Sequence, residues 1–569
     1  MEKNDKGILW FSAAVLFAMS VAALCGLPAA AAETAAQPQV LRNAVVNEAV
    51  QFDVSEPLNE MAQAPAQAGV RVVVHPMLQP KLNKLKAAAP GPSALARYAA
   101  AGPLISASVG LGFEGVGQVG GPLDCPSVAH ITVVPPDTNA AVGDTQVVEW
   151  VNDCYAVFNK STGALIAGPF AGNRFWKDFG APCGNNNDGD PIIQWDKTHH
   201  RWLASQNVFN GPPFYTCVAV SKTADATGGY FRYAFLQQPG FPDYPKWGLT
   251  PGAYYQTQNV FDLNTNAFLG VNVCAYQTSA MLTGIRNAEQ VCIFDNSNGT
   301  VFDDSMLPAD EDSTTSASSN PGEVLLGAID NFFPGGPTVY EYVFKVDFLQ
   351  PGNSTLAGVN GSMPILVPRY DLAFCGSQPN ITTFCVPQPA SKSELLDTLG
   401  DRLMYRLARF DDGVTQHFLV NHSVNDTTAV AARWYEFRAA EGSTSLSLYQ
   451  SGQTPDDGHY RWMGSVAMDQ KGDIAIGYSR SSAALRDQPS IYYAGQTAGD
   501  PLGTTETENL IKQGHGSQFN SFDRWGDYTS MALDGADSCT FWYANEYYPK
   551  AGSFVWDTWL ASLKFPHCH

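Results

Sequence analysis

After its first 32 residues the chain has no apolar run near the roughly 20 residues that a membrane-spanning helix needs. It also has no C-x-x-C pair, G-x-S-x-G elbow, H-E-x-x-H helix or nucleotide-binding loop. These absences argue against zinc, redox, serine-hydrolase and nucleotide-dependent enzymes. Positive charge is scarce, with 33 Lys and Arg against 54 Asp and Glu and a net charge of −21. The balance therefore excludes nucleic acid and anionic membranes as partners.

The N-terminus has the three parts of a secretory signal peptide. Lys3 and Lys6 precede the apolar run ILWFSAAVLFAMSVAALCGL, and residues 29–32 offer an A-x-A cleavage site. A retained membrane anchor is the alternative, but polar and Ala/Pro-rich sequence follows directly. We therefore predict a signal peptide at 1–32, a secreted or periplasmic protein, and no membrane insertion.

Residues 33–124 differ in composition from the rest of the chain. They are rich in Ala, Gln and Pro, and only VRVVV at 70–74 is typical of a strand. This composition predicts a partly disordered leader that precedes the main domain.

Cysteine usage agrees with export. Of the 11 cysteines, Cys25 lies in the predicted signal peptide, which leaves an even number. In an exported protein these are expected to form disulfides. Proximity in sequence suggests five pairs, although sequence alone does not fix them: Cys375 with Cys385, Cys539 with Cys568, Cys274 with Cys292, Cys125 with Cys154, and Cys183 with Cys217.

The main domain, 125–569, repeats one pattern about seven times. A small-residue or aromatic strand is followed by a tight Asp/Gly turn, a second strand and a third, as in GSVAMDQKGDIAIGYS at 464–479. A weaker copy lies at 310–347, with strands in EVLLGAIDN and TVYEYVFKVDF. Such self-similarity predicts an all-β, seven-bladed β-propeller. The seventh repeat lacks an outer strand, and we expect an N-terminal strand, AHITVVPP at 129–136, to close it.

Each repeat has a polar and aromatic loop before its first strand, and in a propeller such loops meet at the mouth of the central channel. The loops are PPDTN, NNNDGDP, FPDYPKW, PADEDS, GDRLMYR, GHYRWMG and DRWGDY. Three of them supply arginines whose forks could together bind the carboxylate of an acidic sugar. The predicted substrate-binding residues are Arg402, Arg461, Arg524, Trp462, Trp525, Asp243, Lys246 and Trp247. Alternatively, Asp–Arg and Arg–Trp pairs at strand starts join neighbouring blades and have no ligand.

A few residues of these loops could supply acid–base chemistry. His459 shares a loop with an arginine and a tyrosine, a set that suits β-elimination of a polysaccharide. The predicted catalytic residues are His459, Tyr405, Asp527 and Tyr528. Clustered acids could hold Ca²⁺, but GNNNDGDP has Gly184 in place of the first ligand of a calcium loop, and no metal site is assigned.

Several segments resemble a widespread group of secreted bacterial β-propeller proteins. The segments are DRLMYR…NHS…RWYEFR, HYRWMGSVAMD…IAIGYS and DRWGDYTSMALD…CTFWYANEYY. The resemblance implies a propeller fold and export, and it transfers no catalytic residue. More distantly, the repeats and arginines resemble sialidase-type and polysaccharide-lyase propellers, although the S-x-D-x-G-x-x-W box of sialidases is absent.

Two functions follow from these observations. One is a secreted glycosidase, lyase or binding protein for carbohydrate, with an acidic polysaccharide as a candidate ligand. The other is a non-catalytic propeller that binds an extracellular protein or supports the cell envelope. The first requires arginines that face one cavity, and the second requires arginines paired with aspartates of their own blades.

Overall fold

Short antiparallel strands make up almost all of the structure, as the apolar bursts between Gly, Pro, Asn and Asp predict. All described strands and helices belong to the unit Pro38–His569. The prediction of an all-β chain is confirmed. The computed structural model describes residues 37–62, 71–73, 106–118, 123–125, 131–180, 182–296, 303–314, 321–329, 338–373, 385–426, 428–519 and 523–569.

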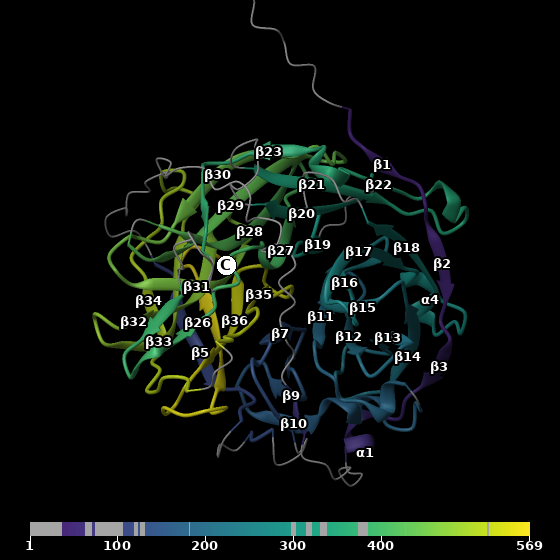
Figure 1. The fold of residues 1–569 in the computed structure, drawn as a ribbon, viewed down its shortest axis with the longest axis horizontal. Coiled ribbons are helices and arrows are strands. Elements are labelled where there is room, and N and C mark those ends of the chain that lie inside the picture. Colours follow the sequence, from purple (N-terminus) through teal and green to yellow (C-terminus); the bar gives the residue numbers. More distant parts are fainter. Residues whose placement is uncertain are drawn as a thin grey trace, which may run out of the picture. The chain divides into compact units, whose positions relative to one another are not determined.

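Seven strands each begin a set of consecutive antiparallel strands, and we call them the first strands. They are β7 (Asn139–Val142), β11 (Ile192–Asp196), β15 (Phe241–Leu249), β19 (Leu307–Glu311), β27 (Met404–Asp411), β31 (Tyr460–Met468) and β35 (Ser530–Leu533). Each contacts the next in chain order, and β35 contacts β7. Figure 1 shows these first strands around a common centre, with the rest of each sheet farther out. The contacts therefore close a cycle.

The second and third strands lie farther out in each set. The second strands are β8 (Gln146–Val151), β12 (Arg201–Val208), β16 (Tyr254–Asp262), β20 (Glu323–Ile329), β28 (Thr415–Asn425), β32 (Ile474–Ser482) and β36 (Thr540–Tyr547). The third strands are β9 (Cys154–Asn159), β13 (Phe214–Ser221), β17 (Ala267–Tyr276), β21 (Thr338–Lys345), β29 (Val430–Ala440), β33 (Asp487–Gln496) and β37 (Asp557–Lys564). The weak repeat at 310–347 thus supplies β20 and β21, as predicted. The sets of β19 and β27 are joined into one sheet by a parallel pairing of these two strands.

Six sets take their fourth strand from the following sequence. These strands are β10 (Leu165–Ala171), β14 (Tyr230–Gln237), β18 (Glu289–Asp295), β22 (Thr355–Ala357), β30 (Ser447–Gln453) and β34 (Asn509–Lys512). Three N-terminal strands extend three of these sheets: β1 (Val40–Leu41) pairs with β22, β2 (Val45–Glu48) with β18, and β3 (Gln51–Val54) with β14. The predicted leader, in which the sequence indicates a single strand, therefore contributes these three strands to the edges of three sheets.

The last set is closed by β5 (Ser108–Glu114), which pairs antiparallel with β37. The prediction that AHITVVPP supplies this closing strand is wrong. Within that stretch β6 (Ile131–Val133) instead pairs parallel with β4 (Arg71–Val73). The outer edge of β37 is already filled by β5, so a closing strand does come from the N-terminal side, but from within the predicted leader.

The remaining elements are short. The extra strands are β23 (Pro364–Leu366), β24 (Asp371–Leu372), β25 (Val386–Gln388) and β26 (Ser391–Leu396). The helices are α1 (Leu58–Ala62), α4 (Thr278–Thr283) and the 3₁₀ turns η1 (Gly172–Trp176), η2 (Cys183–Asn185), η3 (Pro351–Asn353) and η4 (Val359–Gly361). No described helix is long and apolar enough to cross a membrane.

Neighbouring sheets pack face to face through apolar side chains. Leu203, Tyr233 and Trp247, for example, share one buried cluster between the sheets of β11 and β15. Both faces of most strands are covered, so β8 (QVVEWV) is buried throughout and shows no polar–apolar alternation. This packing fixes the starts of the first strands, where the polar loops lie.

Four of the five predicted disulfides are confirmed. They are Cys125–Cys154, Cys183–Cys217, Cys274–Cys292 and Cys539–Cys568. The predicted Cys375–Cys385 pair lies partly outside the described residues, because Cys375 is not among them.

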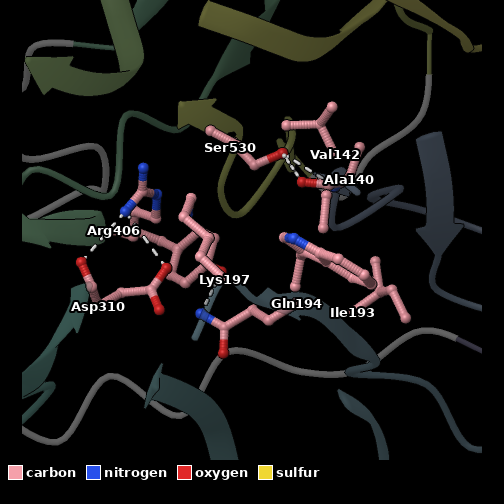
Figure 2. A pocket seen from close by; sticks show the side chains of 12 residues that line it. Ala140, Val142, Ile193, Gln194, Lys197, Asp310, Arg406 and Ser530 are labelled. Carbon is pink, nitrogen blue, oxygen red and sulfur yellow. Dashed lines mark hydrogen bonds and ion pairs between the residues drawn. The ribbon is translucent and has the colours of Figure 1, made fainter. Parts of the chain in front are cut away.

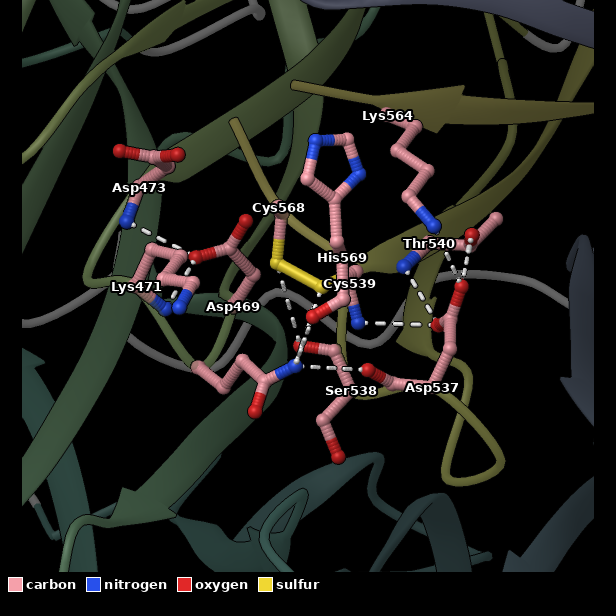
Figure 3. Close-up of a disulfide and its surroundings, with 11 residues drawn as sticks. Asp469, Lys471, Asp473, Asp537, Ser538, Cys539, Thr540, Lys564, Cys568 and His569 are labelled. Atoms are coloured by element: carbon pink, nitrogen blue, oxygen red, sulfur yellow. Dashed lines mark hydrogen bonds and ion pairs between the residues drawn. A yellow bond between two sulfur atoms is a disulfide. The ribbon is translucent and has the colours of Figure 1, made fainter. Parts of the chain in front are cut away.

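The Cys539–Cys568 disulfide, with Cα atoms 5.4 Å apart, fixes the C-terminal tail to the β35–β37 sheet. Figure 3 shows it beside Ser538 and His569. The side chain of Gln470 donates hydrogen bonds to the Asp537 carbonyl (3.0 Å) and the His569 carbonyl (3.5 Å). The tail is therefore held by one covalent bond and several polar contacts.

Replacing both Cys539 and Cys568 with alanine is expected to lower the free energy of unfolding by about 2–3 kcal/mol, because a closed loop of this size restricts the unfolded chain. Urea denaturation of both proteins under oxidising conditions measures the difference. After reduction the wild type should lose more stability than the variant, which has one disulfide fewer to lose. Equal stabilities before reduction would contradict the prediction.

Candidate functional site

The starts of several first strands share one backbone turn, which in β15 and β31 lies at a register shift within the strand. Asp137, Asp190, Tyr244 and Asp527 have positive φ angles of 53°, 49°, 54° and 54°. This left-handed conformation is uncommon for residues other than glycine. Ser305 and Met463 adopt it at matching places, so the turn belongs to the repeat. In four of the six loops it brings a polar or aromatic side chain to the starts of the first strands.

These loops build a set of buried polar groups that we call the central cluster. Its members interact through charge, hydrogen bonds or ring contacts. They come from the sets of β7, β11, β15, β27 and β35. The central cluster consists of Asp137, Asp190, Tyr244, Lys246, Asp401, Arg402, Tyr405, Arg524, Asp527 and Tyr528.

Lys246 lies at the middle of the central cluster. Its Nζ is 3.6 Å from the centre of the Tyr244 ring, 3.7 Å from that of Tyr528 and 5.8 Å from that of Tyr405. The ammonium donates a hydrogen bond to the Pro245 carbonyl at 3.0 Å. Tyr528 also packs edge-on against the other two rings. Three tyrosine rings thus surround one amine.

Burial brings the acid and base groups of the central cluster toward neutral pH. Desolvation lowers the pKa of Lys246 to about 7, against the opposing charges of Asp190 and Asp137. Ring contacts favour a desolvated ammonium by about 2 kcal/mol each, but here they offset only part of the cost of removing the ion from water. Desolvation raises the pKa of Asp190 to about 6 and holds that of Asp137 well above its usual range, where Asp527 adds repulsion. The amine of Lys246 and the carboxyl of Asp190 can therefore exchange protons near neutral pH.

Each of the three predicted arginines is paired with carboxylates of its own region. Arg402 binds Asp401 through two hydrogen bonds, of 2.8 and 3.0 Å. Arg524 binds Asp527, with Nε donating at 2.9 Å. The two forks lie in the central cluster, and the Arg402 guanidinium is also 4.7 Å from the centre of the Tyr244 ring. With their forks filled, these arginines do not form a shared clamp for a carboxylate.

Arg461 belongs to a separate network around β31. Its guanidinium binds both Asp457 and Glu508, at 2.9 and 2.7 Å. His459 lies between Asp457, 3.0 Å from Nδ1, and Asp487, 2.8 Å from Nε2. All these partners come from the β31–β34 sheet or its loops. The structure therefore does not bring His459 together with Tyr405, Asp527 and Tyr528.

The predicted aromatic platforms are part of the core. Trp462 and Trp525 are buried, with ring centres 5.7 Å apart, and Trp525 also stacks on Tyr548. Trp247 packs its ring 4.8 Å from that of Tyr276. Asp243 lies within β15, opposite Asn259. None of the three indole rings is exposed for stacking on a sugar.

A small cavity continues from the central cluster along the first strands. It is lined by residues of β7, β11, β19, β27 and β35 and by Lys197 beside β11. Figure 2 shows Gln194, Arg406 and Asp310 around it. The Gln194 amide donates to the Trp247 carbonyl (3.0 Å) and to the Tyr405 hydroxyl (3.2 Å). Because Tyr405 also faces Lys246, the cavity adjoins the central cluster.

Charged groups at the far ends of the first strands close this cavity. Arg406 donates to the Met531 carbonyl at 2.8 Å and binds Asp310 and Asp312. Lys197 binds Asp312 at 2.8 Å. The sequence predicts PADEDS as a loop, but Asp310 lies within β19 itself. This acid therefore lines the cavity and not the predicted mouth of the channel.

The sequence prediction included Lys246, Arg402, Tyr405, Arg524, Asp527 and Tyr528 of the central cluster and missed the rest. Asp137, Asp190 and Tyr244 lie in the predicted loops but were not chosen. Their place in the loops at the starts of first strands is the available signal. Arg406, the last residue of GDRLMYR, shares this signal, whereas Gln194 looks like an ordinary strand residue.

No group of three or more His, Cys, Asp or Glu side chains that could hold a metal ion is found in the described residues. Asp188 of the GNNNDGDP loop accepts hydrogen bonds from the backbone of Phe209 and Asn210, at 2.8 and 3.1 Å. The carboxylate thus holds a turn.

No protein-family model matches the chain. No curated protein matches it either. Among solved structures, the chain is similar to the phage phi92 endosialidase, with 6% identity over 66% of this chain and 72% of that one and a TM-score of 0.36. It is similar to the polysaccharide lyase Uly1, with 11% identity over 81% and 98% and a TM-score of 0.34. It is similar to Drosophila semaphorin 1b, with 8% identity over 82% and 88% and a TM-score of 0.35. Similarities this low support no conclusion about the activity of this chain.

Proposed function

We propose that the seven sets of strands are the blades of a seven-bladed β-propeller and that the central cluster is its carbohydrate site. The cyclic contacts of the first strands, with β35 against β7, support the blade count. Closure by β5 supports it as well, since it gives the last set a fourth strand. In this arrangement the central cluster lies at the mouth of the channel.

The single observation that carries the proposal is the composition of the central cluster. It combines the amine of Lys246, with a pKa of about 7, the carboxyl of Asp190, with a pKa of about 6, and tyrosine hydroxyls, which converge from five sets of strands. Burial raises the pKa of Asp137 in the same cluster. Groups of this kind donate and accept protons at the oxygens of a glycosidic bond. We therefore propose a glycosidase in which Asp190 acts as acid or base and the charge of Lys246 stabilises its carboxylate.

The proposed substrate is a neutral sugar rather than an acidic polysaccharide. Arg402 and Arg524 are already paired with Asp401 and Asp527. A uronate entering the cluster would have to displace one of these carboxylates, whereas a neutral sugar needs only hydrogen bonds. Neutral hydroxyl groups therefore fit the cluster better.

We also propose that the protein is secreted or periplasmic. Disulfides persist in oxidising compartments, and four are present in the described residues. A predicted signal peptide at 1–32 agrees with this location.

A non-catalytic propeller is the second candidate. The pairing of each arginine with an acid of its own region, such as Arg461 with Asp457, supports it. In that case the central cluster joins the blades, and a rim surface binds an extracellular protein or the cell envelope.

The test uses residues 33–569 with a panel of neutral and acidic polysaccharides. New reducing ends report hydrolysis, and the absorbance of unsaturated uronates reports elimination. We expect reducing ends from a neutral polymer and a loss of about 100-fold or more in rate for Asp190→Asn, since an acid–base group contributes at least this much.

Asp534→Asn is the matched control. Asp534 is as buried as Asp190, with 6% against 7% of its surface exposed, but it pairs with Lys160 at 3.0 Å in a turn outside the central cluster. It should keep full activity. Equal activity of Asp190→Asn and wild type would exclude this site. No product from any polymer would favour the non-catalytic candidate.

A further inference from the structure

Lys246 differs from an ordinary buried lysine in its partners. Lys197, the comparison within this chain, binds Asp312 at 2.8 Å and the Glu311 carbonyl at 3.3 Å. Lys246 is still less exposed and donates one hydrogen bond, to Pro245. No ion pair to it is found in the part of the chain that the structure describes. Its remaining N–H groups face tyrosine rings.

This environment makes the amine nucleophilic. A lysine reacts through its neutral form, which burial beside another cation favours. Here Tyr244 and Tyr528 exclude water from both sides of Nζ at 3.6 and 3.7 Å. The charge of Arg402 also disfavours the ammonium. With a pKa near 7, about half of the amine is neutral at neutral pH, against about one part in a thousand for an exposed lysine.

Two polar atoms beside Lys246 have no partner among the described residues. They are Oδ1 of Asp137 and the hydroxyl of Tyr244, and both residues are more than nine-tenths buried. Both groups lie within the electrostatic reach of Asp527 in the same cluster. Buried polar atoms normally have a partner. A ligand oxygen is one group that would satisfy them.

We propose that Lys246 forms a Schiff base with a small aldehyde or ketone. Its nitrogen lone pair adds to the carbonyl carbon, the carbonyl oxygen takes a proton from the Asp137 carboxyl, and the nitrogen gives one to Asp190. Asp190 then returns its proton to the new hydroxyl, which leaves as water while the C=N bond forms. The iminium nitrogen restores the proton of Asp137. Amine and carbonyl thus give imine and water, and both carboxyls return to their starting state.

Burial limits the size of the carbonyl compound. Lys246 is 1% exposed, while Tyr244, Asp190 and Asp527 in front of it keep 6–7%. We therefore restrict the proposal to a two- or three-carbon aldehyde or ketone. The inference goes beyond the proposed carbohydrate function and does not depend on it.

The test traps the imine in the whole protein. Residues 33–569 are incubated with glycolaldehyde and sodium cyanoborohydride, and adducts are quantified peptide by peptide by mass spectrometry between pH 6 and 10. At pH 7 we expect Lys246 to react at least about tenfold faster than exposed Lys345. Its rate should level off above pH 7. Asp137→Asn should slow the reaction at Lys246 alone.

Two internal references keep the result unambiguous. Lys197 should stay unlabelled in the folded protein, because its amine is held by Asp312. Labelling of Lys246 that is no faster than that of Lys345, or that appears only in denaturant, would overturn the proposal. Since no polysaccharide is used, failure here and failure of the carbohydrate proposal are separate results.

Discussion

Replacing Arg406 with methionine is expected to lower the free energy of unfolding by about 3–5 kcal/mol. Arg406 is buried and binds Asp310 and Asp312, and its Nε donates to the Met531 carbonyl. It therefore joins β27 to β19 and β35. Methionine fills much of the same volume but leaves two buried acids short of a positive charge. Of these two acids, Lys197 forms its ion pair with Asp312.

Urea denaturation followed by tryptophan fluorescence measures this change. Lys564→Met is the control, because Lys564 pairs with Asp537 at 2.9 Å while both side chains keep more than a third of their surface exposed. That variant should lose less than about 1 kcal/mol. Adding Asp310→Asn and Asp312→Asn to Arg406→Met should recover part of the stability. Similar losses for the Arg406 and Lys564 variants would show that the buried network is not important.

The protein is expected to be more stable near pH 5 than near pH 7.5. Burial raises the pKa of several carboxyls to about 7, and desolvation is the largest cause in each case. These groups are Glu149, Asp303, Glu311, Glu341, Asp397, Asp469, Glu506 and Asp557.

The sign follows from proton binding. Between about pH 4.5 and 7 the folded state holds protons that the unfolded chain has released, so stability falls as pH rises, by up to about 1.4 kcal/mol per pH unit for each group. Glu149, Glu311 and Asp397 alone give a loss of several kcal/mol. His422 opposes it, because burial lowers its pKa and the unfolded state then binds the extra proton.

Thermal unfolding at a series of pH values checks this prediction. The melting temperature should drop by several degrees between pH 5 and 7.5. Glu149→Gln tests a single one of these acids. Glu149 accepts hydrogen bonds from the Val116 amide and the Thr558 hydroxyl. The variant should show a smaller drop than wild type. A melting temperature that rises over this range would contradict the assignment of these acids.

Local sequence predicted the strand sets well and the sheet edges poorly. Second and third strands such as β32 and β33 are close in sequence and flanked by Asp/Gly turns, so each set could be identified in place. The strands β1 to β3 have two to four residues and owe their conformation to distant partners. Such short stretches, although rich in valine, give no sign of the sheet edges with which they pair.

The central cluster was predictable in place but not in chemistry. Lys246, Arg402 and Tyr528 were chosen because polar loops precede first strands. Asp401 and Asp527 each bind the guanidinium of an arginine in the cluster. Such pairing depends on side-chain directions, which residue types do not specify. Glu508, which binds Arg461, lies 47 positions away. The ring of Tyr528 contacts Lys246 from another sheet. The sequence alone therefore could not predict that tyrosine rings surround this amine.

The pairing of β5 with β37 has a consequence for how the chain is made. Leu111 donates a hydrogen bond to Ser562, 451 positions later, so the circle cannot close before the ribosome has released nearly the whole chain. Contacts of such separation slow folding. Until then β5 is unpaired and able to associate with other chains. A truncation that removes β37 should therefore yield aggregates rather than a smaller soluble protein.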